Sequence, residues 1–133
     1  MKKIDHIAIA VKNLEYSKEI FSKIFNKNPD KNEYLQDQEV NVCFYNIDNT
    51  KIELVEASNN SSVISKFIAK QGEGLHHISF EVSDLDSEKQ RLQKIGFEIL
   101  ETSSKGANKT KVCFLHPKDT NGVLIELCEI NHK

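Results

Sequence analysis

A chain of 133 residues with 38% hydrophobic residues is long enough for one domain but not for several. Its formal net charge of −2 excludes nucleic acid as the main partner, because the phosphate backbone requires a strongly basic face. No apolar run approaches the length of a membrane span, and charged residues occupy the N-terminal positions that a signal peptide keeps apolar. We therefore expect a cytoplasmic protein that binds neither nucleic acid nor membranes.

The first half of the sequence predicts the order β-α-β-β, with room for a further short strand near Tyr34. The strands are predicted where apolar and polar residues alternate, and the helix where apolar residues recur at helical spacing. These segments are a strand over about 3–11, a helix over about 13–26, and strands over about 39–47 and 50–57. The apolar face of the helix is predicted to consist of Leu14, Ile20, Phe21, Ile24 and Phe25.

A helix over about 61–70, capped by Ser61 or Ser62, leads to a second half that repeats the same order. Asp84 is the expected N-cap of the next helix, and Gly96 lies just past its end. The predicted segments are a strand over about 75–82, a helix over 84–95, and strands over 97–100, 110–116 and 122–130, with a polar loop at 103–108.

The two halves are also related residue by residue. Ile4 to Val11 and Leu75 to Val82 align on a shared His-Ile pair, and each half ends on a strand with Ile-Glu-Leu. A repeat of this kind divides the chain near Gly72 into halves of about 1–71 and 72–133. We therefore predict an α+β fold, a single domain over 1–133 in which two tandem βαβββ modules form a curved mixed sheet around a metal site.

The repeat carries four polar outliers: His6, Glu53, His77 and Glu126. Each occupies a strand position among apolar neighbours, where an ionisable side chain needs a partner to offset its desolvation. If a pseudo-twofold axis relates the halves, the four side chains converge, and their nitrogen and carboxylate ligands suit a divalent ion with positions left for water or substrate. A single residue of this kind is more often exposed on the solvent face; the duplication favours the metal site.

Several other polar residues are assigned to simpler roles. His76 aligns with Asp5, which makes it a structural or supporting residue rather than a ligand. Glu56, Glu81 and Glu129 are interpreted as surface charges without a duplicated partner. The chain has an odd number of cysteines, and all of them lie in apolar segments. They are predicted to be reduced and buried: Cys43, Cys113 and Cys128.

These features resemble the vicinal oxygen chelate superfamily and, within it, the methylmalonyl-CoA epimerase family over nearly the full length of the chain. The most specific segments are Gly72 to Ile78, with its Gly-Leu-His-His, and Phe114 to Lys118, Phe-Leu-His-Pro-Lys, followed by Gly122 to Leu127. Asp5 to Val11 and Asn49 to Leu54 add to the resemblance.

The resemblance implies that His6, His77 and Glu126 bind a divalent ion such as cobalt, and that Glu53 is the remaining polar ligand. Nickel, manganese, zinc or iron also suit such a ligand set. One departure stands out. A bacterial member of the family has a proposed catalytic glutamate on the strand before Glu53, and the matching position here is near Val42, which has no carboxylate.

The implied reaction interconverts (R)- and (S)-methylmalonyl-CoA by proton abstraction at C2 through a metal-stabilised enolate. Glu53 and Glu126 are the catalytic candidates for moving protons on opposite faces of the enolate. The CoA thioester would need a local basic surface, for which the sequence offers Lys105, Lys109, Lys111 and Lys118. Relatives with this fold are usually homodimers, so we expect a homodimer here.

Two alternatives stay open at this point. Glyoxalase I uses a similar His, Glu, His, Glu ligand set and isomerises a thiol hemithioacetal, but glyoxalases tend to carry a different turn where this chain has Phe114 to Asp119. A drug-binding protein of the same fold would need no metal, and the four intact polar residues argue against it.

Overall fold

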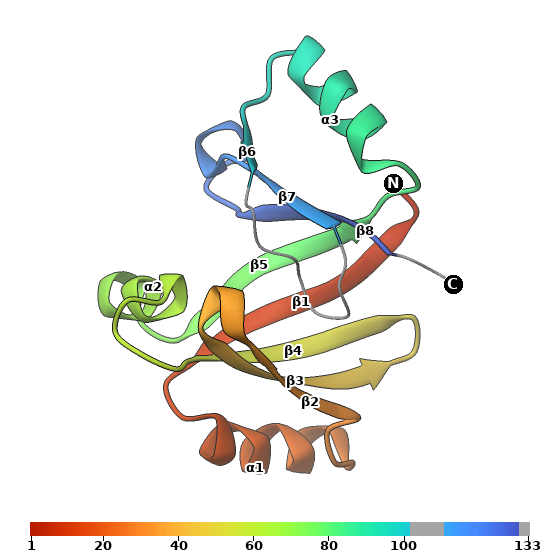
Figure 1. The fold of residues 1–133 in the computed structure, drawn as a ribbon. Coiled ribbons are helices and arrows are strands. Elements are labelled where there is room, and N and C mark those ends of the chain that lie inside the picture. The colour runs from red at the N-terminus through yellow and green to blue at the C-terminus, as the bar shows by residue number, and fades with distance from the viewer. Residues whose placement is uncertain (102–110, 131–133) are drawn as a thin grey trace. The chain divides into compact units, whose positions relative to one another are not determined.

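The computed structural model of the protein describes residues 1–101 and 111–130. Their helices and strands follow the predicted order, with two βαβββ modules joined by a helix, which confirms the α+β class (Figure 1). The first module consists of β1 (Lys3–Val11), α1 (Leu14–Phe25), β2 (Lys31–Leu35), β3 (Val40–Ile47) and β4 (Thr50–Ala57). The remainder comprises α2 (Val63–Gln71), β5 (Gly74–Glu81), α3 (Leu85–Lys94), β6 (Ile99–Glu101), β7 (Lys111–Leu115) and β8 (Ile125–Glu129).

The chain divides into two compact units, and the boundary falls inside β1 and β5. The central unit is Ile7–His76, and its hydrogen-bonded strands follow the order β2-β3-β4-β1. The terminal unit combines Met1–His6 with His77–Lys133, and its order is β1-β5-β8-β7-β6. Because β5 and β8 pair in parallel while β7 pairs antiparallel with both β6 and β8, the strands of the terminal unit form a mixed arrangement.

In the central unit, α1 covers one face of β3 and β4. Its N-cap is Asn13, whose side chain accepts a hydrogen bond from the backbone of Tyr16. The core of this face consists of Val11, Leu14, Cys43, Tyr45 and Leu54, with Phe21 and Phe25 packed against it. The sequence prediction was wrong for two helix residues, because Ile20 and Ile24 are 40% and 65% exposed.

In the terminal unit, α3 packs on the strands through Leu85 and Leu92. Asp84 is the N-cap, as predicted, and its side chain accepts a hydrogen bond from the backbone of Ser87. The core consists of Val82, Leu85, Leu92, Cys113, Leu115 and Leu127. The three cysteines are free and buried, which confirms their predicted state.

Two of the strand predictions in this unit, those for β6 and β8, began too early. β6 begins at Ile99, and β8 begins at Ile125 rather than at residue 122. For β8 the reason is a tight turn, in which the backbone N–H of Gly122 donates to the Pro117 carbonyl oxygen at 2.8 Å. Gly122 has a φ of +83°, a conformation that favours glycine. The predicted polar loop 103–108 lies outside the described residues.

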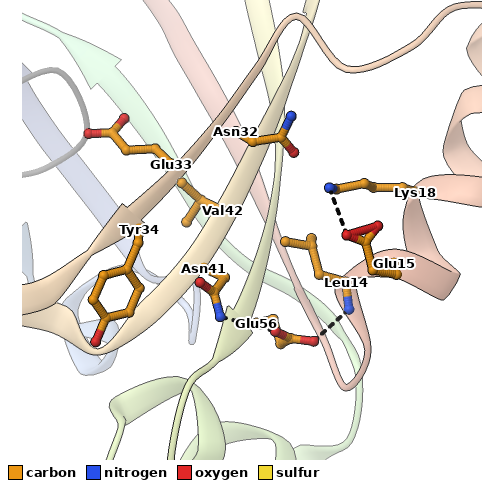
Figure 2. A pocket seen from close by; sticks show the side chains of 9 residues that line it. All are labelled: Leu14, Glu15, Lys18, Asn32, Glu33, Tyr34, Asn41, Val42 and Glu56. Carbon is orange, nitrogen blue, oxygen red and sulfur yellow. Dashed lines mark hydrogen bonds and ion pairs between the residues drawn. The ribbon is translucent and has the colours of Figure 1, made fainter.

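Two glutamates interpreted as surface charges instead hold the starts of helices. Glu56 accepts a hydrogen bond from the backbone N–H of Leu14 at 2.7 Å, as Figure 2 shows, and Glu129 accepts one from Leu85 at 2.8 Å. A carboxylate there satisfies a free N–H and interacts favourably with the helix dipole. Glu81 is also not a surface residue, since it is only 4% exposed. Among the described residues, no helix is both long and apolar enough to cross a membrane.

Candidate metal centre

Two histidines of the terminal unit point at each other from neighbouring strands. His6 lies on β1 and His77 on β5, and they are only 9% and 8% exposed. Their Nε2 atoms are 3.1 Å apart, and the rings meet edge to face with centroids 5.2 Å apart. Alternation along the strands places both side chains on one face, so the sequence repeat brings these two predicted ligands together.

Glu126 on β8 completes a cluster of three side chains in this unit. Its Oε1 lies 3.5 Å from Nε2 of His6, and its Oε2 lies 3.6 Å from Nε2 of His77. Ser79, paired with Glu126 in the parallel register of β5 and β8, donates a hydrogen bond from its Oγ to Oε1 at 2.6 Å. Two strands thus fix the position of this carboxylate.

The spacing of these donor atoms fits a divalent ion. Ligand atoms about 2.1 Å from an ion and at right angles to each other are about 3 Å apart. The 3.1 Å separation of the two imidazole nitrogens therefore matches adjacent ligand positions, and the Glu126 oxygens lie slightly farther from these nitrogens, at 3.5 and 3.6 Å. Imidazole nitrogen and carboxylate oxygen are donors that first-row transition metals accept.

The electrostatics of Glu126 point the same way. Burial raises the pKa of its carboxyl group, while His6 and the hydrogen bond from Ser79 lower it in part. A buried carboxylate without a compensating cation is unfavourable. A bound divalent ion would offset that cost and keep Glu126 ionised.

Asp5 orients His6 for such a role. Its Oδ2 lies 2.8 Å from Nδ1 of His6, and the side chain is buried. Because a carboxylate accepts hydrogen bonds, the imidazole proton resides on Nδ1 and the lone pair of Nε2 faces His77. This role of Asp5 was not among the sequence predictions, although an acidic residue directly before a candidate ligand was an available signal.

Glu53, the fourth predicted ligand, belongs to the central unit. It lies on β4, opposite Phe44 of β3, and is 6% exposed. Its side chain projects from the strand face opposite to the one that α1 covers, because its neighbour Leu54 belongs to the core under that helix.

His76 lies in the central unit and contacts the ring of Phe67 edge to face, with centroids 4.8 Å apart. Burial lowers its pKa to about 4, so it is neutral near pH 7. This packing suits the structural role that the sequence suggested for it.

The candidate CoA-binding lysines lie in the second module. Lys118 is 59% exposed on its side chain, and its Nζ lies 2.7 Å from Oε1 of Glu98. Lys111 is also exposed and lies 3.9 Å from Glu129. Lys105 and Lys109 lie outside the described residues.

Comparisons with known proteins show the family to which the chain belongs. Residues 5–114 match the model of the glyoxalase/bleomycin resistance protein/dioxygenase superfamily. The mitochondrial methylmalonyl-CoA epimerase of Dictyostelium discoideum is 36% identical over 96% of this chain and 78% of the relative. The ethylmalonyl-CoA/methylmalonyl-CoA epimerase of Cereibacter sphaeroides is 35% identical over 96% of this chain and 98% of its own.

A solved structure extends the similarity to the backbone. A methylmalonyl-CoA epimerase in complex with methylmalonyl-CoA and ammonium superposes with a TM-score of 0.93, at 29% identity over 99% of this chain and 96% of that chain. These similarities confirm the resemblance that the sequence motifs indicated.

Proposed function

The chain belongs to the glyoxalase/bleomycin resistance protein/dioxygenase superfamily, and we propose that it is a metal-dependent epimerase that interconverts (R)- and (S)-methylmalonyl-CoA. The observation that carries this proposal is the convergence of His6, His77 and Glu126 in a chain that is similar to methylmalonyl-CoA epimerases over more than nine-tenths of its length.

The ion would be held by these three residues, with Glu53 as the fourth ligand. Support for Glu53 comes from the repeat, in which it is the counterpart of Glu126, and from its burial on a strand. A bound divalent ion supplies positive charge that stabilises the charge developing on the substrate's carbonyl oxygens. We propose cobalt, and the ligand set also accepts nickel, manganese, zinc or iron.

The reaction removes the C2 proton, which is acidic because it lies between two carbonyl groups. A carboxylate on one face of C2 takes this proton, and a carboxylic acid on the other face returns one, so that configuration inverts. Glu126 and Glu53 are the candidates for these roles. Their burial favours proton transfer away from water, although each must share its charge with the ion.

The CoA part of the substrate would be held by Lys105, Lys109, Lys111 and Lys118. Lysines bind phosphate groups as point charges, and the exposed Lys118 can exchange Glu98 for a phosphate. Replacing Lys118 with Ala should raise KM for methylmalonyl-CoA and leave KM for the short pantetheine thioester unchanged. Equal effects on the two substrates would exclude a phosphate contact.

We also propose a cytoplasmic homodimer. The three free, buried cysteines support a reducing compartment, and the dimer is supported by the resemblance. Light scattering of the purified protein measures the dimer directly: a mass of one chain would contradict it.

Deuterium incorporation at C2 of methylmalonyl-CoA, followed by proton NMR in deuterated water, tests the proposed function. We expect the metal-stripped protein to be inactive and cobalt to restore exchange. Glu126→Gln should abolish it, whereas Glu129→Gln on the same strand should not. No exchange by the metal-loaded protein would contradict the proposal. In that case, turnover of a glutathione hemithioacetal would identify a glyoxalase. Binding of an aromatic drug without metal would instead identify a binding protein.

A further inference from the structure

The central unit carries two glutamates on one face of its three adjacent strands. In the register of these strands, Glu33 of β2 lies opposite Val42 of β3, and Phe44 of β3 lies opposite Glu53 of β4. Val42 and Phe44 are two residues apart, so all four side chains project to the same side. The opposite side is the one that packs against α1, through Cys43, Tyr45 and Leu54.

The Glu33 carboxylate is partly buried and lies beside the ammonium group of Lys31. Its side chain is 27% exposed, and its Oε1 lies 3.5 Å from Nζ of Lys31. Oε1 is buried and has no hydrogen-bond partner among the described residues. Figure 2 shows Glu33 beside Val42, projecting away from the side on which Asn32 lies. Because Oε1 of Glu33 has an ion-pair partner but no hydrogen bond, its desolvation is only partly offset, and a proton taken from a bound substrate would satisfy it.

The position of Glu33 answers a difficulty in the proposed reaction. Val42 occupies the place where a catalytic glutamate is expected from the resemblance, and it has no group that can carry a proton. Side chains directly opposite each other on neighbouring strands lie about 5 Å apart, so Glu33 brings a carboxylate close to that place from the next strand. Unlike Glu53 and Glu126, it is not needed as a metal ligand.

We propose that Glu33 is a catalytic residue that transfers the proton on one face of the substrate's C2 carbon. The proposal rests on the epimerase function proposed above. The C2–H bond breaks, the proton binds a carboxylate oxygen of Glu33, and the electron pair moves into the adjacent thioester carbonyl as an enolate. A second acid then delivers a proton to the opposite face. Proton exchange with solvent afterwards returns Glu33 to its carboxylate and the second group to its acid form, so the cycle closes and no oxidant or reductant is required.

The test compares two rates at C2 of the substrate: inversion of its configuration and exchange of its proton for deuterium. Each epimer of methylmalonyl-CoA is incubated separately with the protein in deuterated water. For Glu33→Gln we expect epimerisation to fall by about 100-fold or more in both directions, the usual contribution of a general base. One epimer presents its C2 proton to the second acid-base group rather than to Glu33. For that epimer, exchange of the C2 proton for deuterium should persist, and the configuration should be retained. The cobalt Kd, measured by calorimetry, should stay within about twofold of wild type. The control is Glu19→Gln, at an exposed residue of α1, which should match wild type.

Three outcomes would overturn the assignment of Glu33. These are an epimerisation rate close to that of wild type in the folded variant, loss of exchange for both epimers, or a large rise in the cobalt Kd, which would make Glu33 structural. Wild-type protein that exchanges neither epimer would instead refute the epimerase function itself, so the two failures are distinguishable.

Discussion

Asp5 and His6 form a buried pair in which the Asp5 carboxylate lies 2.8 Å from Nδ1 of the imidazole. This contact fixes the ring so that Nε2 faces His77. We predict that Asp5→Asn weakens cobalt binding by about 10- to 100-fold, because an amide does not raise the basicity of the imidazole as a carboxylate does.

Calorimetric titration of the metal-free protein measures this effect. Asp86→Asn is a matched control, because that side chain is 78% exposed on α3. An Asp5→Asn protein that folds and binds cobalt as tightly as the control would show that the pair does not support a metal ligand.

The hydrogen bond from Leu85 to Glu129 predicts a contribution to stability. Replacing Glu129 with Ala leaves the first N–H of α3 without its carboxylate, and we expect the free energy of unfolding to fall by about 1 kcal/mol. Urea denaturation gives the value. Glu19→Ala, at an exposed site, should change it by less than about 0.5 kcal/mol. Equal effects of the two substitutions would rule out the capping role.

His76 predicts a pH dependence of stability in the metal-free protein. Burial lowers its pKa from 6.5 to about 4, so between these values the unfolded chain binds a proton that the folded chain does not. The free energy of unfolding should therefore decrease as the pH falls from 6.5 towards 4, by an amount on the order of 1–3 kcal/mol. His76→Gln should remove this part of the slope, and denaturation curves at pH 7 and pH 4.5 measure it. An unchanged slope would contradict a buried neutral imidazole.

The cysteines predict resistance to thiol reagents. Burial raises the pKa of Cys43 to about 11 and that of Cys128 to about 12, and both are almost inaccessible to solvent. At pH 8 only about 0.1% or less of either thiol is ionised. Ellman's reagent should therefore leave them unmodified in the folded protein and label them once urea is added. Rapid labelling without urea would mean that these strands open readily.

The order of elements was predictable because strand and helix periodicities are local properties of the chain. Which side of a helix is buried is not local, and α1 shows why. Its apolar residues lie on more than one side, and the partners Cys43, Tyr45 and Leu54 determine that Phe21 and Phe25 face the core. The exposure of Ile20 and Ile24 could be known only from that packing.

The site was predictable to the extent that it repeats. The duplication predicts that four side chains converge. His6, His77 and Glu126 lie together in the terminal unit, and the ligand role of these residues and of Glu53 stays a prediction. The same duplication relates Glu56 to Glu129, because each lies two residues after an Ile-Glu-Leu. Both glutamates accept a hydrogen bond at the start of a helix, so extending the repeat to this position would have marked them as a related pair. Glu33 carries no such signal, because its position opposite Val42 depends on the register between β2 and β3.

A single titration tests the central claim, that a metal centre built on His6, His77 and Glu126 drives epimerisation. Cobalt is added to metal-free protein while its visible absorption and the rate of methylmalonyl-CoA epimerisation are recorded together. We predict that both rise in proportion and saturate at the same ratio of one ion per chain, and that His77→Ala loses both. An absorption change that saturates without any rise in rate, or full epimerisation before cobalt is added, would contradict the account.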